Sequence, residues 1–376
     1  MEQRSYWLAW RELNGIGAVL LHRLWQHFGS VETAWTATSE ELQQVEGIGK
    51  QRAEKIVADR QLLNPEKLLA TYQQYNPHFI VPSDAEYPAM LKSIPDAPTI
   101  LHYRGDLELL KSLETRRGIA IVGTRKAGKY GSTWAERYSQ VLTQQDFIII
   151  SGLAEGIDTI AHEACIGAGG QTIAVLGNGV DQVYPHSNRD LYERIEHNGL
   201  ILSEYPAGTR PDRKHFPARN RIVAGLSHAT LVMEAGMTSG ALITANLANE
   251  YGREVYALAG NLDSPQSEGC IHLILQGAHI LPKPEKFLEL LEVMPSPCYE
   301  EPKSKDLEVK VCSVLPTLEP LLQTLIESII QLHNNAPIDL IIETTKMSTS
   351  EVSSGLLQLE MMDLIVQNPG MRYAIV

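Results

Sequence analysis

The chain has 376 residues, a hydrophobic content of 44% and a formal net charge of -13 at pH 7. Its length predicts two or three domains, and its apolar content is sufficient for a packed core. The acidic balance argues against a protein that coats nucleic acid through its overall charge, but it does not exclude one with a single local basic site. Four distant cysteines without a C-x-x-C pair indicate a reduced, cytoplasmic protein without structural zinc. We expect no membrane association, because no apolar run has membrane-spanning length and the first residues lack a signal-peptide pattern.

Residues 1–75 are predicted to form a small helical domain with an internal repeat. A hydrophobic-x-Gly-Ile-Gly pattern occurs at residues 13–17 and again at 45–49, each time before an amphipathic stretch. The pattern resembles the helix-hairpin-helix of SAM-like domains, whose glycine turn directs backbone amides at a DNA phosphate. The alternative is that the glycines only make tight turns in a helical bundle. The second copy is the better phosphate candidate, because Lys50, Arg52 and Lys55 lie near it.

Residues 76–117 are rich in proline and are predicted to form a connector that packs on the following domain. Prolines forbid long regular elements here, so only two short strands are expected, at Phe79–Val81 and Ile100–Tyr103. Apolar residues recur throughout the segment, which favours packing over a free linker.

Residues 118–292 are predicted to form an α/β domain with a doubly wound and mostly parallel sheet, for which the family resemblance described below implies a Rossmann-like fold. Short apolar runs alternate with helical stretches, as in sheets covered on both faces. The predicted strands are Ile119–Val122, Phe147–Ile150, Thr172–Leu176, Leu200–Leu202, Thr230–Met233 and Glu254–Leu258. Polar turns follow five of them, at residues 123–125, 151–158, 177–181, 203–204 and 234–236. Carboxyl ends of parallel strands open at one edge of the sheet, so these turns should converge on one crevice.

The turns lack the patterns of the common cofactor sites. No G-x-G-x-x-G is present, so NAD is not expected, and the absence of G-K-[ST] excludes a P-loop. Asp158 and His162 have the i, i+4 spacing of a metal or acid–base pair, or of a structural hydrogen bond. No third ligand is near them in the sequence, so we expect neither metal nor cofactor. Glu204 and Glu234 could act as catalytic carboxylates, but no order of residues supports covalent chemistry.

Residues 210–221 form an island of positive charge on this acidic chain. Six basic or potentially basic side chains occur there, interrupted by Asp212: Arg210, Arg213, Lys214, His215, Arg219 and Arg221. Phe216 lies among them, and an aromatic ring among cations suits a chain of phosphates with stackable bases. In an extended segment Arg219 and Arg221 would face the same way and meet one strand of phosphates, whereas in a helical turn they would diverge.

Two plainer interpretations of this basic run stay open. It is either an ordinary surface loop, or Phe216 belongs to the core while one arginine pairs with Glu204 or Glu234.

An ordered set of motifs resembles the DNA-processing protein DprA family, also called Smf. The motifs include I-V-G-T-R (121–125), I-S-G-L-A-E-G-I-D-T-I-A-H (150–162), F-P-A-R-N-R-I-V-A-G-L-S (216–227), S-G-A-L-I-T-A (239–245) and G-C-I-H-L-I-L-Q-G-A (269–278). The resemblance implies a non-enzymatic homodimer, formed through the Rossmann-like domain, that binds and protects incoming single-stranded DNA. It further implies that the protein helps to load the RecA recombinase in natural transformation and DNA recombination.

The resemblance also names the residues expected to bind DNA. These are Arg125, Lys214, Phe216, Arg219 and Arg221, with Asn220 in support, Arg213 competing with Lys214, and the turn glycines Gly123, Gly152 and Gly240. The alternative function is a nucleotide-processing hydrolase with a lysine-decarboxylase-like site that uses Glu234, and a third is a scaffold without ligand. Residues 271–275 are a candidate dimer contact, but a buried helix of the core is the better explanation.

The C-terminal region is predicted to be a linker over residues 293–315 and a winged-helix-like domain over residues 316–376. Residues 293–376 contain five Lys or Arg against eleven Asp or Glu, and Ser348–Glu351 would open the recognition helix without a cation. Phosphate contacts need positive charge, so we interpret this domain as a protein-interaction or structural element.

Overall fold

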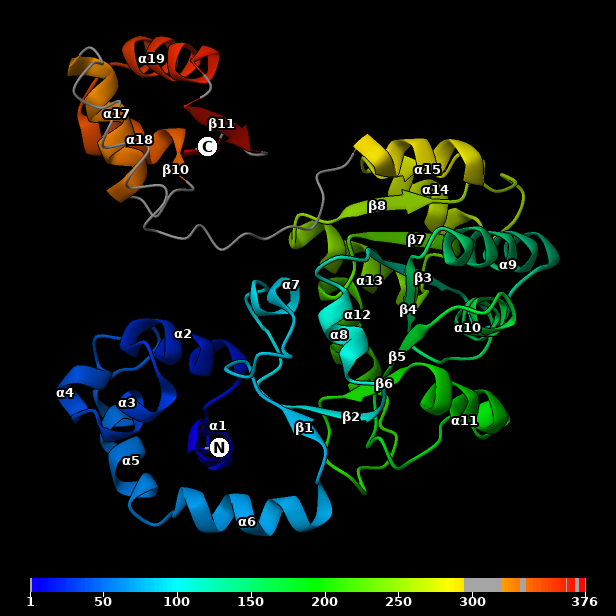
Figure 1. Ribbon diagram of the computed structural model, residues 1–376, viewed down its shortest axis with the longest axis horizontal. Coiled ribbons are helices and arrows are strands. Elements are labelled where there is room, and N and C mark those ends of the chain that lie inside the picture. Colours follow the sequence, from blue (N-terminus) through cyan, green and yellow to red (C-terminus); the bar gives the residue numbers. More distant parts are fainter. Residues whose placement is uncertain (1, 294–319, 332–335, 363, 369–371, 376) are drawn as a thin grey trace. The chain divides into compact units, whose positions relative to one another are not determined.

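The computed structural model describes residues 2–293, 320–331, 336–362, 364–368 and 372–375. The chain forms two compact units, Met1–Cys298 and Tyr299–Val376, which are described separately (Figure 1). The predicted linker lies outside the described residues except for Val293, and the domain boundaries drawn within the first unit stay predictions. No described helix is long and apolar enough to cross a membrane.

Residues 2–75 are helical, as the sequence predicts. Gly17 and Gly49 are the N-cap residues of two of these helices, and Gly15 and Gly47 before them have φ of +85° and +93°, a backbone region that favours glycine. Trp7 and Trp10 are fully buried in the core that the helices share. The helices are α1 (Glu2–Glu12), α2 (Ala18–Phe28), α3 (Val31–Thr36), α4 (Ser39–Leu42), α5 (Lys50–Arg60) and α6 (Pro65–Tyr75).

The connector extends the central sheet as well as packing on it. It contributes β1 (Phe79–Ile80), α7 (Ala89–Lys92), β2 (Leu101–Gly105) and α8 (Glu108–Ser112). Strand β2 pairs antiparallel with both β1 and β6. Backbone pairing therefore joins the proline-rich segment to the α/β domain.

The central sheet has nine strands in the order β1-β2-β6-β5-β4-β3-β7-β8-β9, and every pair from β6 to β9 is parallel. The six strands predicted for this domain are confirmed within one or two residues. The domain's strands are β3 (Gly118–Gly123), β4 (Ile148–Ser151), β5 (Thr172–Leu176), β6 (Leu200–Ser203), β7 (Ala229–Glu234), β8 (Glu254–Ala257) and β9 (His279–Ile280).

Helices cover both faces of this sheet (Figure 1). Successive residues of β3 alternate between two cores: Ile119 and Ile121 pack with α9, α10 and α15, whereas Ala120 and Val122 pack with α12, α13 and α14. This alternation explains why the strands read as continuously apolar. The helices are α9 (Lys129–Gln144), α10 (Ile157–Gly167), α11 (Arg189–Asn198) after the 3-10 turn at His186–Asn188, α12 (His215–Gly225), α13 (Gly240–Glu250), α14 (Glu268–Leu275) and α15 (Pro284–Val293).

The second unit is a winged helix, as predicted. Its elements are α17 (Pro320–Gln331), β10 (Ala336–Pro337), α18 (Ile338–Thr345), α19 (Thr349–Met361), β11 (Ile365–Asn368) and β12 (Arg372–Ile375). Leu325, Ile341 and Leu356 are fully buried in its core. The Ser348–Glu351 pattern is a capping box at the start of α19, which explains the acidic residue there. The protein-interaction role stays a prediction.

Two histidines of the first unit are buried inside this fold. His102 of β2 makes hydrogen bonds with Tyr72 Oη (2.7 Å) and the carbonyl oxygen of Ser203 (3.2 Å). His162 of α10 makes one with Thr172 Oγ1 (2.7 Å). Burial lowers the pKa of His102 to about 4 and that of His162 to about 3, so both are neutral at pH 7.

We expect acid to destabilise the protein through these histidines. Unfolding returns each to its ordinary pKa of about 6.5, so the unfolded state binds more protons and stability falls as pH drops from about 6.5 towards 4. Each should cost about 2 kcal/mol at pH 5. Urea unfolding of His162→Gln should therefore show a smaller loss between pH 7 and pH 5 than the parent chain, and His27→Gln is the exposed control. An equal loss in both variants would contradict this assignment.

Candidate nucleic-acid interface

A cleft of about 780 Å³ lies at the carboxyl ends of β3 and β7. The chain runs outward from β3 through β4 and β5 to β6, then returns to place β7 on the other side of β3. Loops from neighbouring strands separate at such a switch point, where doubly wound sheets bind ligands. Turns after β3, β4 and β7 line the cleft, whereas residues 177–181 and 203–204 do not. The predicted crevice is therefore present, with three of the five turns in it.

Eight of the ten residues singled out from the sequence line this cleft. They are Arg125, Arg213, Phe216, Arg219, Asn220, Gly123, Gly152 and Gly240. Lys214 and Arg221 are not among its lining residues. Of the two neighbouring cations, Arg213 is therefore the better candidate for binding the strand. Lys214 is exposed outside the cleft, and its backbone N–H donates to Asp212 Oδ1 (2.8 Å).

Phe216 forms an aromatic wall with a residue that sequence reasoning did not assign to the site. The ring of Tyr184, in the segment that follows β5, lies 5.5 Å from that of Phe216 at an interplanar angle of 32°. Arg125 Cζ lies 5.6 Å from the Phe216 ring centroid, a cation–π arrangement. The sequence does contain a sign of this role, because Tyr184 is an aromatic residue that comes shortly after the glycine turn at the end of β5. Lys126 and Gln266 also line the cleft and were missed.

Arg219 lines the cleft, but its guanidinium already donates hydrogen bonds to main-chain carbonyl oxygens. Its side chain is 5% exposed, and Nη1 donates to the carbonyl oxygens of Gly152 (2.6 Å) and Val175. A Cβ on Gly152 would lie 2.5 Å from this guanidinium, so glycine is required there. Burial lowers the pKa of Arg219 to about 10, against the opposing effect of Asp158, so Arg219 stays charged at neutral pH.

Asp158 has a structural role beneath Arg219. Its carboxylate accepts the backbone N–H groups of Gly152 (3.1 Å) and Ala154 (3.3 Å), which holds the turn after β4. Burial raises the pKa of Asp158, whereas Arg219 lowers it. His162 hydrogen-bonds elsewhere, and the described residues include no group of three possible metal ligands. The two residues therefore do not act as a pair: Asp158 holds the turn after β4, and His162 bonds to Thr172 of β5.

The extended alternative for Arg219 and Arg221 is wrong, because both belong to α12, which begins at His215. Residues two apart on a helix point about 200° away from each other, so the two guanidiniums diverge. Asn220, between them, donates from Nδ2 to the carbonyl oxygen of Gly240 (3.1 Å), which ties α12 to the start of α13.

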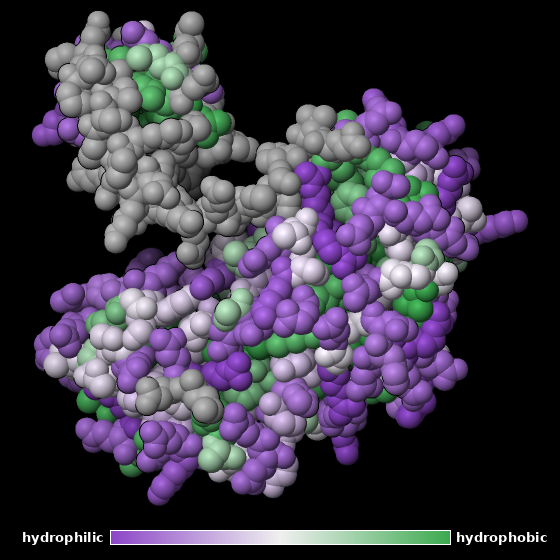
Figure 2. Space-filling model, viewed as in Figure 1, coloured by the Kyte–Doolittle hydropathy of each residue, from purple (hydrophilic) through white to green (hydrophobic). Residues whose placement is uncertain are grey.

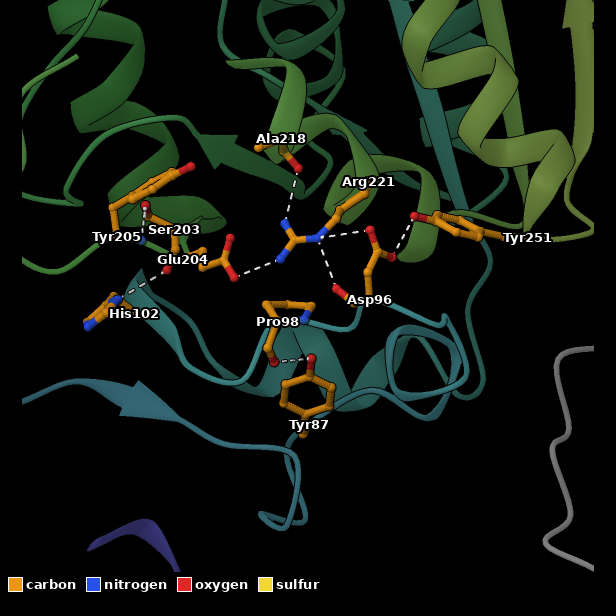
Figure 3. A network of polar contacts seen from close by, with 10 residues as sticks. All are labelled: Tyr87, Asp96, Pro98, His102, Ser203, Glu204, Tyr205, Ala218, Arg221 and Tyr251. Carbon is orange, nitrogen blue, oxygen red and sulfur yellow. Dashed lines mark hydrogen bonds and ion pairs between the residues drawn. The ribbon is translucent and has the colours of Figure 1, made fainter. Parts of the chain in front are cut away.

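Arg221 makes an internal ion pair instead of lining the cleft (Figure 3). Its Nη2 lies 2.7 Å from Glu204 Oε1, and its Nε donates to the carbonyl oxygen of Asp96 (2.9 Å). Tyr251 donates its O–H to Asp96 Oδ1 (2.7 Å). Burial lowers the pKa of Arg221, but Glu204 and Asp96 more than compensate and raise it. The alternative in which one arginine pairs with Glu204 is thus the correct one for Arg221.

Glu234 does not line the main cleft. It is 8% exposed, and its Oε2 accepts the backbone N–H of Gly128 (2.8 Å), the N-cap residue of α9. Its carbonyl oxygen accepts the N–H of Thr124 (2.7 Å). Glu234, which the hydrolase alternative would use as its catalytic carboxylate, therefore holds the turn after β3, beside the cleft.

Comparison with known families agrees with this geometry. Residues 78–292 match the family model described as DNA recombination-mediator protein A. The chain belongs to this family, DprA/Smf. Residues 314–371 match the DprA winged helix domain, and residues 11–61 match the SAM-like helix-hairpin-helix tandem.

One relative matches this DprA/Smf chain over nearly its whole length, and two solved DprA structures match part of it. Protein Smf of Synechocystis is 43% identical over 391 aligned residues, which cover 99% of this chain and 98% of the relative. The X-ray structure of DprA from Streptococcus pneumoniae has a TM-score of 0.66 at 34% identity and covers 76% of this chain and 97% of its own. A Helicobacter pylori DprA structure, described for a single-stranded DNA binding mode, has a TM-score of 0.52 at 30% identity and covers 57% and 95%.

Arg221→Met should destabilise the first unit by roughly 3–5 kcal/mol, because it leaves the Glu204 carboxylate buried without a partner. Urea unfolding measures the loss, and the double variant Arg221→Met/Glu204→Gln should recover part of it. DNA binding by the folded variant should keep its salt dependence. A stable variant whose log–log salt slope is flatter by about 0.7 would instead place Arg221 on a phosphate.

Proposed function

We propose that this chain binds single-stranded DNA in the cleft, without an enzymatic step, and helps to load a RecA-type recombinase. The charge of the lining carries the proposal. Among the described residues that line the cleft, four are Lys or Arg (Arg125, Lys126, Arg213 and Arg219) and the only carboxylate is Asp158. The Asp158 carboxylate accepts backbone N–H groups of the turn after β4, so it does not pair with the exposed Arg125, Lys126 and Arg213. These three cations can therefore attract phosphates.

A single strand fits this cleft better than a duplex does. Phe216 is half-buried beside Tyr184, so a base that stacks on its ring must first unstack from the adjacent bases of its own strand. Bases of a duplex are already stacked and paired. The H. pylori relative, described for its single-stranded DNA binding mode, supports the same ligand here.

The salt dependence of oligonucleotide binding separates the roles of the cleft residues. Arg213→Ala should remove one phosphate contact and flatten the log–log slope by about 0.7, whereas Lys214→Ala, the neighbouring control, should leave it nearly unchanged. Phe216→Ala should weaken binding by about 1–3 kcal/mol without changing the slope, because stacking is not ionic. Anisotropy titrations with an oligothymidine measure both. Equal slopes for all three variants would remove Arg213 from the phosphate path.

The recombinase step rests on the family's description as a recombination mediator. In the same variants, the rate at which RecA assembles on a single strand should fall in proportion to the lost strand affinity. Unchanged assembly by a variant that no longer binds DNA would contradict a direct hand-over.

We also propose that the chain forms a homodimer through the edge of its Rossmann-like domain. Leu275, at the end of α14, is 81% exposed, and Ile280 of the edge strand β9 is 60% exposed. Figure 2 shows apolar surface where Figure 1 places α14 and α15, on a face that is otherwise mostly hydrophilic. Residues 271–275 of α14 therefore have two faces. Leu273 is buried in the core, and Leu275 is available for the proposed dimer contact.

Leu275→Glu should weaken self-association about 100-fold, because a dimer would bury an unpaired carboxylate. Sedimentation velocity measures this, with Leu62→Glu as the control, since Leu62 is similarly exposed (85%) in the helical region. A chain that is monomeric at high micromolar concentration, or a dimer unaffected by Leu275→Glu, would exclude this interface.

A further inference from the structure

A second cavity, of about 510 Å³, lies beside the cleft. The start of α9, the carboxyl ends of β7 and β8, and the loop between β8 and α14 line it. Gln266 lines both hollows, and its Nε2 donates to the carbonyl oxygen of Lys126 (3.2 Å). A ligand long enough to leave the cleft past Gln266 therefore reaches this cavity next.

The wall of the cavity contains a buried carboxylate with a spare acceptor. Glu234 is 8% exposed and lines the cavity, and its Oε2 is bound by the N–H of Gly128. Its Oε1 receives no hydrogen bond from the part of the chain that the structure describes. A carboxylate oxygen accepts hydrogen bonds and cannot donate them, so Oε1 can bind a ligand that brings N–H groups.

The mouth of the cavity suits a nucleotide better than a small cation. Tyr130 is 54% exposed, and its O–H donates to the carbonyl oxygen of Ala259 (3.2 Å), which holds the ring at the rim. Lys126 at the cleft and Lys129 at the cavity are both exposed, so positive charge continues from one to the other. An aromatic ring with cations around it is the combination that binds a base and its phosphate.

We propose that this cavity is a second base subsite on the same strand, and that Glu234 gives it a preference for guanine. This rests on the proposed single-strand binding. An ionised carboxylate only accepts hydrogen bonds. Guanine alone presents two adjacent donors, N1–H and the 2-amino group, on its Watson–Crick edge. Thymine places one N–H between two carbonyls, and adenine and cytosine set one amino group beside a ring acceptor. Only guanine can therefore donate at the same time to Oε1 and to the lone pair of Oε2 that Gly128 leaves unused.

The test compares an oligothymidine with an oligonucleotide of equal length in which isolated guanines are spaced by thymidines. The full chain should bind the guanine-containing strand about 10-fold more tightly, the size of one good bidentate contact. Glu234→Gln keeps the side chain's volume and an oxygen for Gly128 N–H, but it puts an amide donor against guanine's donors. This variant should bind the two strands equally. Glu250→Gln removes the same charge at the exposed far end of α13 and should keep the preference.

Two further arms make the outcome specific. Replacing guanine by hypoxanthine, which lacks the 2-amino group, should lose most of the preference in the parent chain. Guanosine monophosphate is tested as a competitor, because a free nucleotide offers the same base edge. Competition by the nucleotide without any preference among strands would overturn the subsite, as would equal binding of both strands by the parent chain. Failure to bind either strand would instead overturn the proposed function.

Discussion

The ion pair between Arg221 and Glu204 holds the cleft in shape. Arg221 lies on α12, Glu204 follows β6, and Asp96 belongs to the connector, so one guanidinium joins three segments that are distant in the sequence. A buried arginine is stable only with its partners in place, which leaves α12 little freedom to shift. The same helix carries Phe216 and Arg219, so their positions at the cleft depend on the contacts that Arg221 makes outside it.

The arginines of the basic run divide between support and exposure. Arg219 binds the carbonyl oxygens of Gly152, directly after β4, and of Val175, inside β5. Arg213 and Arg125 stay exposed at the cleft, where a polyanion can reach them. A buried cation still adds to the local field, because little water screens it. The same residue type thus shapes the site at one position and presents charge at another.

The acidic balance of the chain does not oppose an anionic ligand here. Glu204 and Asp96 face Arg221, Asp158 holds a turn below Arg219, and Glu234 binds the start of α9. These carboxylates compensate buried groups close to the site, and the exposed charged side chains that line the cleft are cationic. Local potential therefore differs in sign from the net charge of -13.

Periodicity and turn residues determined most of the fold. Short apolar runs between glycines, such as Thr172–Leu176, favour buried strands, and glycines such as Gly17 and Gly49 mark where helices begin. The strands, the helical N-terminus and the winged helix therefore follow from local pattern. The edge of the sheet that carries the site follows as well, since loops after parallel strands share one edge.

Local pattern could not predict which way the side chains of Arg219 and Arg221 point. Arg219 and Arg221 are two residues apart in one basic run, and only the helical path of α12 and the placement of Glu204 beside it decide which of them reaches the cleft. The role of Tyr184 and the connector's pairing with β6 were likewise settled by tertiary structure, because each depends on a partner far away in the chain that no local pattern names.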